Sequence, residues 1–239
     1  MKDEAQATAP GLLAPDLEVV RDFISTAMHD LREPLRAIRL GSHLLAAEGG
    51  SPSAENAARG TRYVLEGVDR LETLIRDIAE YCYEEARTPS FTELDLEMVL
   101  LEARNELAAE IKSCGAAITH GPLPVVTGNF ASLATAMRSL ISNACKFRAE
   151  APVTVHIGAV REGHKWILSV RDNGMGFDPA YRERIFRPFE RLNGRQFPGS
   201  GLGLTLAKKI IEQHGGDIWA DSSPDQGTTI SFRLPQADS

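Results

Sequence analysis

Two glycine-rich segments of this chain could form the two ends of a nucleotide pocket. Segment 172–177 reads DNGMGF, and its carboxylate, Asp172, could accept a hydrogen bond from the exocyclic amine of a base. The neighbouring glycines, Gly174 and Gly176, leave the backbone bare, so that a flat base could approach it closely. Asp172 and these glycines therefore predict the base-binding end of the pocket.

The second segment, 199–204, reads GSGLGL and precedes a predicted helix. Unpaired backbone N–H groups gather at the start of a helix, where the helix dipole favours negative charge. Two other phosphate-binding motifs are excluded, because Leu204 stands where the dinucleotide fingerprint needs its last glycine and Ser200 stands where the phosphate loop needs lysine. The residues expected to lie against the phosphates are Gly199, Gly201, Leu202 and Gly203.

Five segments, in order along the chain, resemble the five sequence boxes of sensor histidine kinases. The resemblance extends from about Leu17 to Pro235, and the EPLR ending of the first box is most similar to kinases of the bacteriophytochrome type. The sequence contains no photoreceptor module. The five segments are the H box at 23–36 (FISTAMHDLREPLR), the N box at 140–147 (LISNACKF), the G1 box at 172–177, the F box at 185–191 (IFRPFER) and the G2 box at 199–204.

The resemblance implies an ATP-dependent protein-histidine kinase that phosphorylates His29. Near pH 7 an imidazole is largely neutral, so one ring nitrogen can attack the terminal phosphorus of ATP. In the family, the acid after the histidine hydrogen-bonds the other ring nitrogen and accepts its proton, and here that acid is Asp30. Arg191 of the F box is expected to neutralise charge on the transferred group. The phosphoryl group would then pass to an aspartate in the receiver domain of a response regulator.

The resemblance also implies the ligands of Mg²⁺ and of the phosphates. Asn143 is expected to hold Mg²⁺ through its amide oxygen, a hard neutral ligand suited to a cation that bridges phosphates. Lys146, one helical turn further on, could touch phosphate oxygens or be solvated. Ser139 departs from the family, which usually has a second asparagine there, and this could weaken contacts to metal or phosphate. Glu33 replaces the threonine or asparagine of members that also act as phosphatases, which argues against phosphatase activity.

Two other functions stay open. A phosphotransfer or docking scaffold of the same fold, without kinase activity, is favoured by Ser139 and by the missing sensor region. An ATPase of the gyrase and heat-shock chaperone type would use a similar pocket. Those enzymes place a glutamate near position 139 to activate water, so this chain is expected to hydrolyse ATP poorly.

The bulk composition limits the partners. The 239-residue chain has a net charge of −7, which disfavours broad contact with nucleic acid or with an anionic membrane surface. Its three cysteines, Cys82, Cys114 and Cys145, have no CxxC spacing, so neither a disulfide framework nor a zinc site is predicted. No apolar stretch approaches the roughly 18 residues of a membrane span. We expect a cytoplasmic protein that binds no nucleic acid and does not span the membrane.

Two helical patterns predict a hairpin at the start of the chain. Apolar residues recur every seven positions from Leu17 to Leu45, which places His29 on the outer face of the first helix. After a turn rich in glycine and serine, a second pattern runs from Val64 to Cys82 in steps of four and three. Each buried Leu or Ile contributes about 1.5–3 kcal/mol, and one hairpin cannot cover both stripes. We therefore expect a homodimer in which two hairpins form a four-helix bundle.

The rest of the chain alternates strands and helices. Helices are expected over 96–112, 130–147 and 202–214, and strands near 116–120, 153–159, 166–170, 217–221 and 228–234. The predicted fold is an all-α helical hairpin followed by an α/β two-layer sandwich, which by resemblance is of the GHKL ATP-binding type. The expected division is a flexible lead (1–15), a dimerisation and phosphoacceptor domain (16–88) and a catalytic ATP-binding domain (89–239). A sensor module is expected in a longer chain or in a separate protein.

Overall fold

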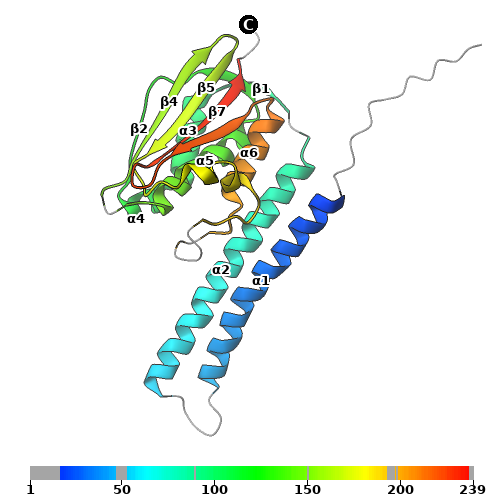
Figure 1. Cartoon of the computed structure of the whole chain (residues 1–239), viewed down its shortest axis with the longest axis vertical. Helices are drawn as coiled ribbons and strands as arrows, with labels where there is room; N and C mark the ends of the chain where they lie inside the picture. Colours follow the sequence, from blue (N-terminus) through cyan, green and yellow to red (C-terminus); the bar gives the residue numbers. More distant parts are fainter. Residues whose placement is uncertain are drawn as a thin grey trace, which may run out of the picture.

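A helical hairpin and a sheet covered by helices on one face make up the chain (Figure 1). The computed structural model describes residues 17–46, 53–88, 90–149, 151–192, 197 and 199–236. The predicted flexible lead (1–15) and most of the predicted turn between the first two helices lie outside the described residues. None of the described helices is both long and apolar enough to cross a membrane.

Helices α1 (Leu17–Leu45) and α2 (Ala54–Ala86) pack against each other as the predicted hairpin. Their close approach depends on glycines. A Cβ added at Gly60 would lie 2.8 Å from the carbonyl oxygen of Gly41, and one at Gly67 would lie 2.9 Å from that of Pro34. The bare backbone at these positions therefore allows the two helices to touch.

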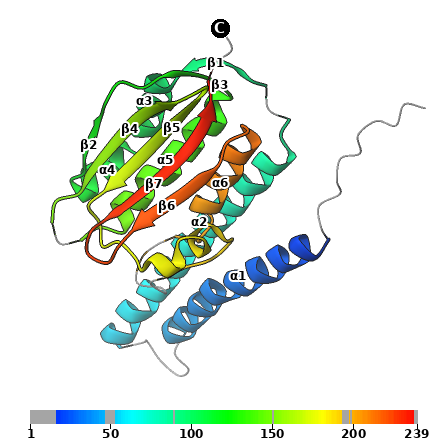
Figure 2. The same cartoon turned by 45° about the horizontal axis from the view of Figure 1, so that its top comes forward.

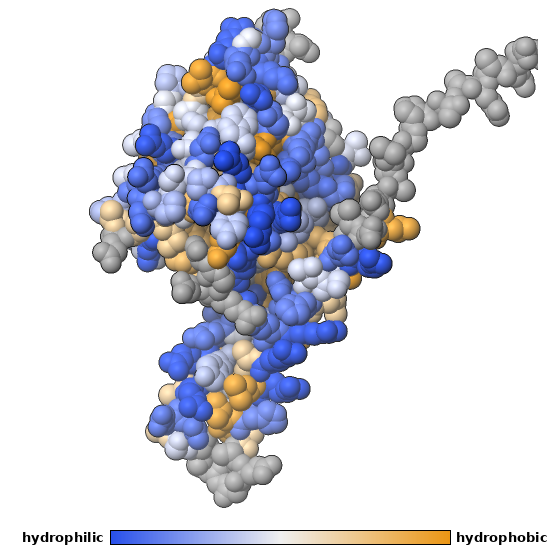
Figure 3. Space-filling model, viewed as in Figure 1, coloured by the Kyte–Doolittle hydropathy of each residue, from blue (hydrophilic) through white to orange (hydrophobic). Residues whose placement is uncertain are grey.

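The hairpin covers only part of its apolar surface. Ala27 and Leu74 are buried, whereas Ile24, Leu35 and Leu65 are 55%, 50% and 58% exposed. Figure 3 shows apolar residues gathered on the part of the hairpin that extends beyond the sheet. One hairpin therefore leaves apolar side chains uncovered, as expected, although Leu35 and Leu65 lie outside the two stripes seen in the sequence.

The second part of the chain is a five-stranded mixed sheet with helices on one face (Figure 2). The strand order is β2-β4-β5-β7-β6, in which β2 and β4 run parallel and the other neighbours antiparallel. The predicted α/β two-layer sandwich is thereby confirmed. The elements are β1 (Thr92–Asp95), α3 (Leu96–Glu106), α4 (Ala108–Cys114), β2 (Ala117–His120), β3 (Val125–Gly128), α5 (Phe130–Lys146), β4 (Thr154–Glu162), β5 (Lys165–Asp172), the short 3₁₀ helices η1 (Pro179–Tyr181) and η2 (Arg184–Phe186), α6 (Gly203–Gln213), β6 (Ile218–Ser222) and β7 (Thr228–Pro235).

The core of this part lies between the sheet and α3, α5 and α6. Strand β4 alternates as predicted, with Val155 and Ile157 fully buried. Helices α5 and α6 contribute Ile141 and Ile210 to the same cluster. Burial of this apolar stripe sets the rotation of α5 about its axis, and therefore which of its side chains face the site.

Two features of this part differ from the sequence prediction. The helix expected over 96–112 is two helices, which separate at Leu107. Leu107 is buried and continues the apolar spacing of α3, but its backbone (φ −91°, ψ 6°) leaves the helical region. The antiparallel pair formed by β1 and β3 was not predicted at all.

The expected domain boundary at 88/89 falls in the connection between α2 and β1, and the division into domains stays a prediction.

Candidate functional site

A cavity of about 410 Å³ lies between α5, the segment before α6, and the side of α2. This volume is in the range of small-molecule sites. Gly174, His29 and Asp30, also expected in the site, do not line it. The predicted site residues that do line it are Asn143, Lys146, Asp172, Gly176, Arg191, Gly199, Gly201, Leu202 and Gly203.

Asp172 ends strand β5 at one end of the cavity. Its Oδ1 accepts hydrogen bonds from the backbone N–H groups of Gly174, at 2.8 Å, and Thr228, at 3.1 Å. Burial raises the pKa of Asp172 above its ordinary value, while these two N–H donors lower it. Both hydrogen bonds end on Oδ1, so Oδ2 is left without a partner in the described part of the chain. The fixed carboxylate can therefore accept a further hydrogen bond from a ligand.

The glycines after Asp172 have a packing role. Gly174 positions the carboxylate through its N–H group, and it is buried against the carbonyl oxygen of Phe147. Gly176 has a φ of 61°, and any Cβ there would collide with the carbonyl oxygen of Ser223. Close contacts within the chain thus require glycine at both positions. This role differs from the one predicted from the sequence, in which the bare backbone lets a base approach.

The segment before α6 presents open backbone to the cavity. Helix α6 begins at Gly203, and its N-cap residue, Leu202, makes no side-chain capping bond. A Cβ added at Gly203 would meet nothing nearer than Ser139, at 3.8 Å. The N–H groups of the first turn of α6 therefore face a space that suits an anion.

Helix α5 brings polar side chains to the same space. Asn143 and Lys146 line the cavity, and the described part of the chain gives neither side chain a hydrogen bond or an ion pair. The amide oxygen of Asn143 is therefore available to a cation, which is the fit expected of a Mg²⁺ ligand. Ser139, the departure from the family pattern, also lines the cavity.

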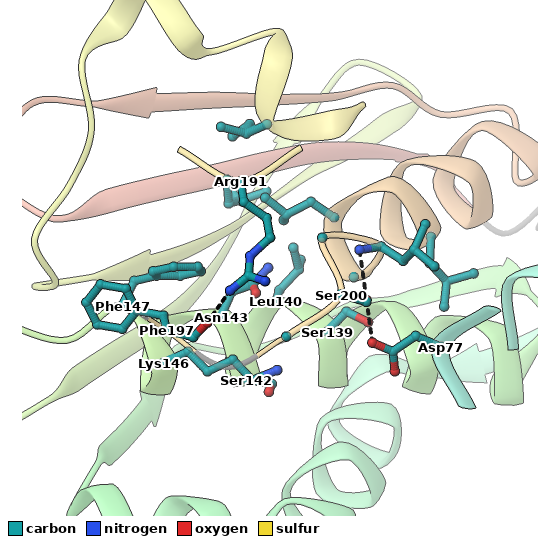
Figure 4. Close-up of a pocket in the computed structure, with 18 of the residues that line it drawn as sticks. Asp77, Ser139, Leu140, Ser142, Asn143, Lys146, Phe147, Arg191, Phe197 and Ser200 are labelled. Atoms are coloured by element: carbon teal, nitrogen blue, oxygen red, sulfur yellow. Dashed lines mark hydrogen bonds between the residues drawn. The ribbon is translucent and has the colours of Figure 1, made fainter. Parts of the chain in front are cut away.

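Arg191 extends into the cavity from the loop after η2 (Figure 4). Its guanidinium donates a hydrogen bond to the carbonyl oxygen of Phe197. Burial, and then the like charge of Arg70, lower the pKa of Arg191, while the carboxylate of Asp30 raises it. Arg191 is thus held within the electrostatic reach of the acid beside His29.

Phe189 fixes this loop between the sheet part and the hairpin. Its backbone N–H donates to the carbonyl oxygen of Gly201 at 3.1 Å, and its ring lies 5.1 Å from that of Phe23 on α1. Phe189 also shares a buried cluster with Ala27 and Leu202. Ala27, two positions before His29, therefore belongs to the same buried cluster as the segment that begins α6.

His29 lies on the outer face of α1, as predicted, with 74% of its side chain exposed. Its Nδ1 is 3.0 Å from Oδ1 of Asp30, the neighbouring acid. Glu33, one turn further along, forms an ion pair with Arg70 of α2 at 3.0 Å. His29 is therefore open to an incoming partner. Glu33, at the position that the resemblance relates to phosphatase activity, is held by its ion pair with α2.

The sequence did not reveal the part of the site that comes from α2. Asp77 and Glu80 line the cavity from the hairpin side, and Arg138 of α5 lies opposite them. A detectable signal existed, because Asp77, Glu80 and Glu84 follow helical spacing and form an acidic stripe along α2. That stripe would ordinarily be read as a solvated face.

Two families match this chain. Residues 128–238 match the family described as histidine kinase-, DNA gyrase B-, and HSP90-like ATPase. Residues 19–81 match the His Kinase A (phospho-acceptor) domain. The first match contains all the predicted cavity residues, and the second contains His29 and Asp30.

Known proteins resemble the chain over most of its length. Cyanobacterial phytochrome A of Nostoc sp. is 38% identical over 235 residues, which cover 96% of this chain and 31% of that protein. The structure of full-length ShkA in complex with AMPPNP is 25% identical with a TM-score of 0.62, and the match covers 92% of this chain and 46% of ShkA. Histidine kinase ThkA, in complex with response regulator protein TrrA, shares the fold, with a TM-score of 0.69 at 21% identity over 92% of this chain and 63% of ThkA. This chain spans about a third of the length of the phytochrome.

Proposed function

Since the chain belongs to the sensor histidine kinases and is a catalytic core of that family, we propose that it phosphorylates its own His29 from ATP and passes the phosphoryl group to an aspartate of a response regulator. One observation carries the proposal. Segments around Asn143, Asp172 and Gly201, far apart in the sequence, meet on one cavity of about 410 Å³ beside a hairpin that bears an exposed histidine–aspartate pair.

In this proposal the adenine base is bound at the Asp172 end of the cavity. The free Oδ2 would accept a hydrogen bond from the exocyclic amine, while Oδ1 stays bonded to Gly174 and Thr228. The phosphates would lie at the other end, against Gly199, Gly201 and the N-terminus of α6. Lys146 would add a positive charge there.

Asn143 would hold Mg²⁺ through its unpartnered amide oxygen. The described part of the chain has no group of three or more His, Cys, Asp or Glu side chains that could hold a metal, so phosphate oxygens and water would complete the coordination. Bound there, the cation would neutralise charge on the phosphates.

The phosphoryl transfer would use the geometry of His29 and Asp30. With the Nδ1 proton directed to Oδ1 at 3.0 Å, Nε2 keeps its lone pair for attack on the terminal phosphorus. The new Nε2–P bond forms as the bond from that phosphorus to the bridging oxygen of ADP breaks, and Asp30 takes the Nδ1 proton. Arg191 would stabilise charge on the transferred group.

We further propose that the chain acts as a homodimer. The exposed apolar residues of the hairpin, such as Ile24, Leu35 and Leu65, would be buried between two copies in a four-helix bundle. The match of residues 19–81 to the phosphoacceptor domain supports this arrangement.

The partner of the phosphorylated chain would be a receiver domain. ThkA, which shares this fold, is in complex with a response regulator, and this supports a partner of the same kind here. An input module would belong to a longer protein or to a second one. Because the reaction consumes ATP, we place the chain in the cytoplasm, where ATP is supplied.

Incubation with γ-labelled ATP and Mg²⁺ tests the proposal. The unaltered chain should acquire label that is stable in base and lost in acid, as expected of a phosphohistidine, and His29→Gln should acquire none. His43→Gln, at another exposed histidine of α1, is the matched control and should label normally. Release of free phosphate without labelling would instead indicate an ATPase, and neither label nor phosphate would indicate a scaffold without kinase activity.

A further inference from the structure

Two carboxylates of α2 reach the cavity from the hairpin side. Oδ2 of Asp77 accepts a hydrogen bond from the hydroxyl of Ser200 at 2.5 Å. Glu80 forms an ion pair with the guanidinium of Arg138. Ser200 belongs to the glycine-rich segment before α6 and Arg138 to α5, so each carboxylate holds a residue that lines the cavity. Figure 4 shows Asp77 beside Ser200.

The partners of these carboxylates are ordinary phosphate ligands. A guanidinium and a hydroxyl beside a helix N-terminus both donate hydrogen bonds to phosphate oxygens. Ser200 already supports that helix start, because its Oγ accepts a hydrogen bond from the N–H of Leu202 at 3.1 Å. In this arrangement, however, both donors point to carboxylates of the same chain.

Asp77 and Glu80 also place two negative charges at a partly buried side of the cavity. Burial raises the pKa of Glu80, Arg138 lowers it, and the negative charges of Asp77 and Glu106 raise it. The charges of Asp77 and Glu80 therefore repel each other, and the charge of Glu80 is compensated by Arg138, which also forms an ion pair with Glu106 at 3.1 Å. A triphosphate entering the same space would add several negative charges and compete for the same guanidinium.

We propose that Asp77 and Glu80 are internal competitors of the ATP triphosphate for Ser200 and Arg138, so that docking of α2 on the cavity and binding of ATP weaken each other. The inference depends on the proposed function, because it takes the cavity to be the ATP site. By linkage the effect is reciprocal. ATP loosens the hairpin from the cavity, and any movement that draws α2 away raises the affinity for ATP.

Such a movement would also open the apolar contacts of α2 beside the cavity, where Leu74 shares a buried cluster with Phe189 and Leu202. Other contacts of α2 lie away from the cavity. At the end of the helix, the carboxylate of Glu84 accepts a hydrogen bond from the hydroxyl of Ser132 at 2.8 Å, and the backbone carbonyl of Glu84 accepts one from the side chain of Gln213 at 3.0 Å. Neither Ser132 nor Gln213 lines the cavity. The end of α2 can therefore stay attached while the stretch from Leu74 to Glu80 moves off and exposes this cluster.

Calorimetric titration of the full chain with a non-hydrolysable ATP analogue and Mg²⁺ tests this inference. The double variant Asp77→Asn with Glu80→Gln should bind the analogue about tenfold more tightly than the unaltered chain. Binding of adenosine, which carries no phosphate, should stay the same. Glu72→Gln, an exposed acid on the same helix, is the matched control for charge and should leave both affinities unchanged.

The possible results separate the two proposals. If the unaltered chain binds the analogue but the double variant binds it no more tightly, the competition is overturned and the ATP site stands. Equal tightening for adenosine would also overturn it, because the effect would then not involve phosphate. If the unaltered chain binds no adenine nucleotide, the proposed function itself fails.

Small-angle X-ray scattering of the unaltered chain gives a second test that needs no variant. Addition of the analogue with Mg²⁺ should raise the radius of gyration as α2 leaves the cavity, and adenosine should not. An unchanged radius at saturating analogue would overturn the inference.

Discussion

The buried ring of His214 accepts a hydrogen bond through Nε2 from the backbone N–H of Asn129, at 2.9 Å. Its Nδ1 donates to the carbonyl oxygen of Ile210 at 2.7 Å. Asn129 is the N-cap of α5, so the ring joins the end of α6 to the start of the helix that carries Asn143. Nε2 can accept this bond only while the imidazole is neutral.

This bond predicts a loss of stability in mild acid. Burial lowers the pKa of His214, while the bond to Ile210 and the charge of Glu84 raise it. With the folded pKa below the unfolded one, the unfolded chain binds a proton first as the pH falls. The stabilisation is therefore fully present only above the unfolded pKa of about 6.5 and is lost as the pH falls from there toward the folded pKa, so the chain should be less stable at about pH 5.5 than at about pH 7.5.

Urea unfolding at several pH values measures this dependence. His214→Gln should be less stable at neutral pH and should show a smaller change between the two pH values. His164→Gln, at an exposed histidine, should keep the full change. An identical pH dependence in His214→Gln and the unaltered chain would show that another group is responsible.

Asp172→Asn should separate ligand binding from folding. An asparagine keeps the Oδ1 acceptor for the N–H groups of Gly174 and Thr228, and it removes a charge whose burial raises the pKa of Asp172. The melting temperature should therefore stay the same or rise. Binding of ATP should weaken by about 1–3 kcal/mol, because a charge-assisted hydrogen bond to the base is lost.

Calorimetric titration and thermal unfolding of the same preparation give both quantities. Asp221→Asn, an exposed acid of β6, is the control and should change neither. Unaltered ATP affinity in Asp172→Asn would mean that the base is bound elsewhere.

Most of the sheet part could be predicted because its elements carry a local pattern. Strand β4 alternates buried and exposed residues, and α5 buries a continuous stripe that includes Ile141. The break at Leu107 was missed because this residue continues the apolar spacing of α3 while its backbone turns. Strands β1 and β3 were missed because four residues show little alternation by themselves and because, unlike the equally short β2, they lie outside the five-stranded sheet and pair with each other.

The candidate site, too, could be predicted only in part. Asn143, Asp172 and Gly201 lie in segments whose residue types are informative by themselves, and the structure places them on one cavity. The contacts of Asp77 with Ser200 and of Glu80 with Arg138 join residues 123 and 58 positions apart. They depend on how the hairpin docks, which no local spacing encodes.

The glycine contact in the hairpin gives a last prediction, since Gly60→Ala sets two effects against each other. Alanine favours a helix by about 1 kcal/mol over glycine. Its Cβ, however, would lie 2.8 Å from the carbonyl oxygen of Gly41 and 2.9 Å from Cγ of Leu45, and such overpacking costs about 1–3 kcal/mol. Because backbone atoms of α1 cannot yield without moving the helix, we expect a net loss of stability and a lower melting temperature at fixed protein concentration.

Gly121→Ala is the control, since a Cβ there meets nothing within 4 Å, and it should be neutral or slightly stabilising. A higher melting temperature for Gly60→Ala would mean that the two helices are not in contact at this point.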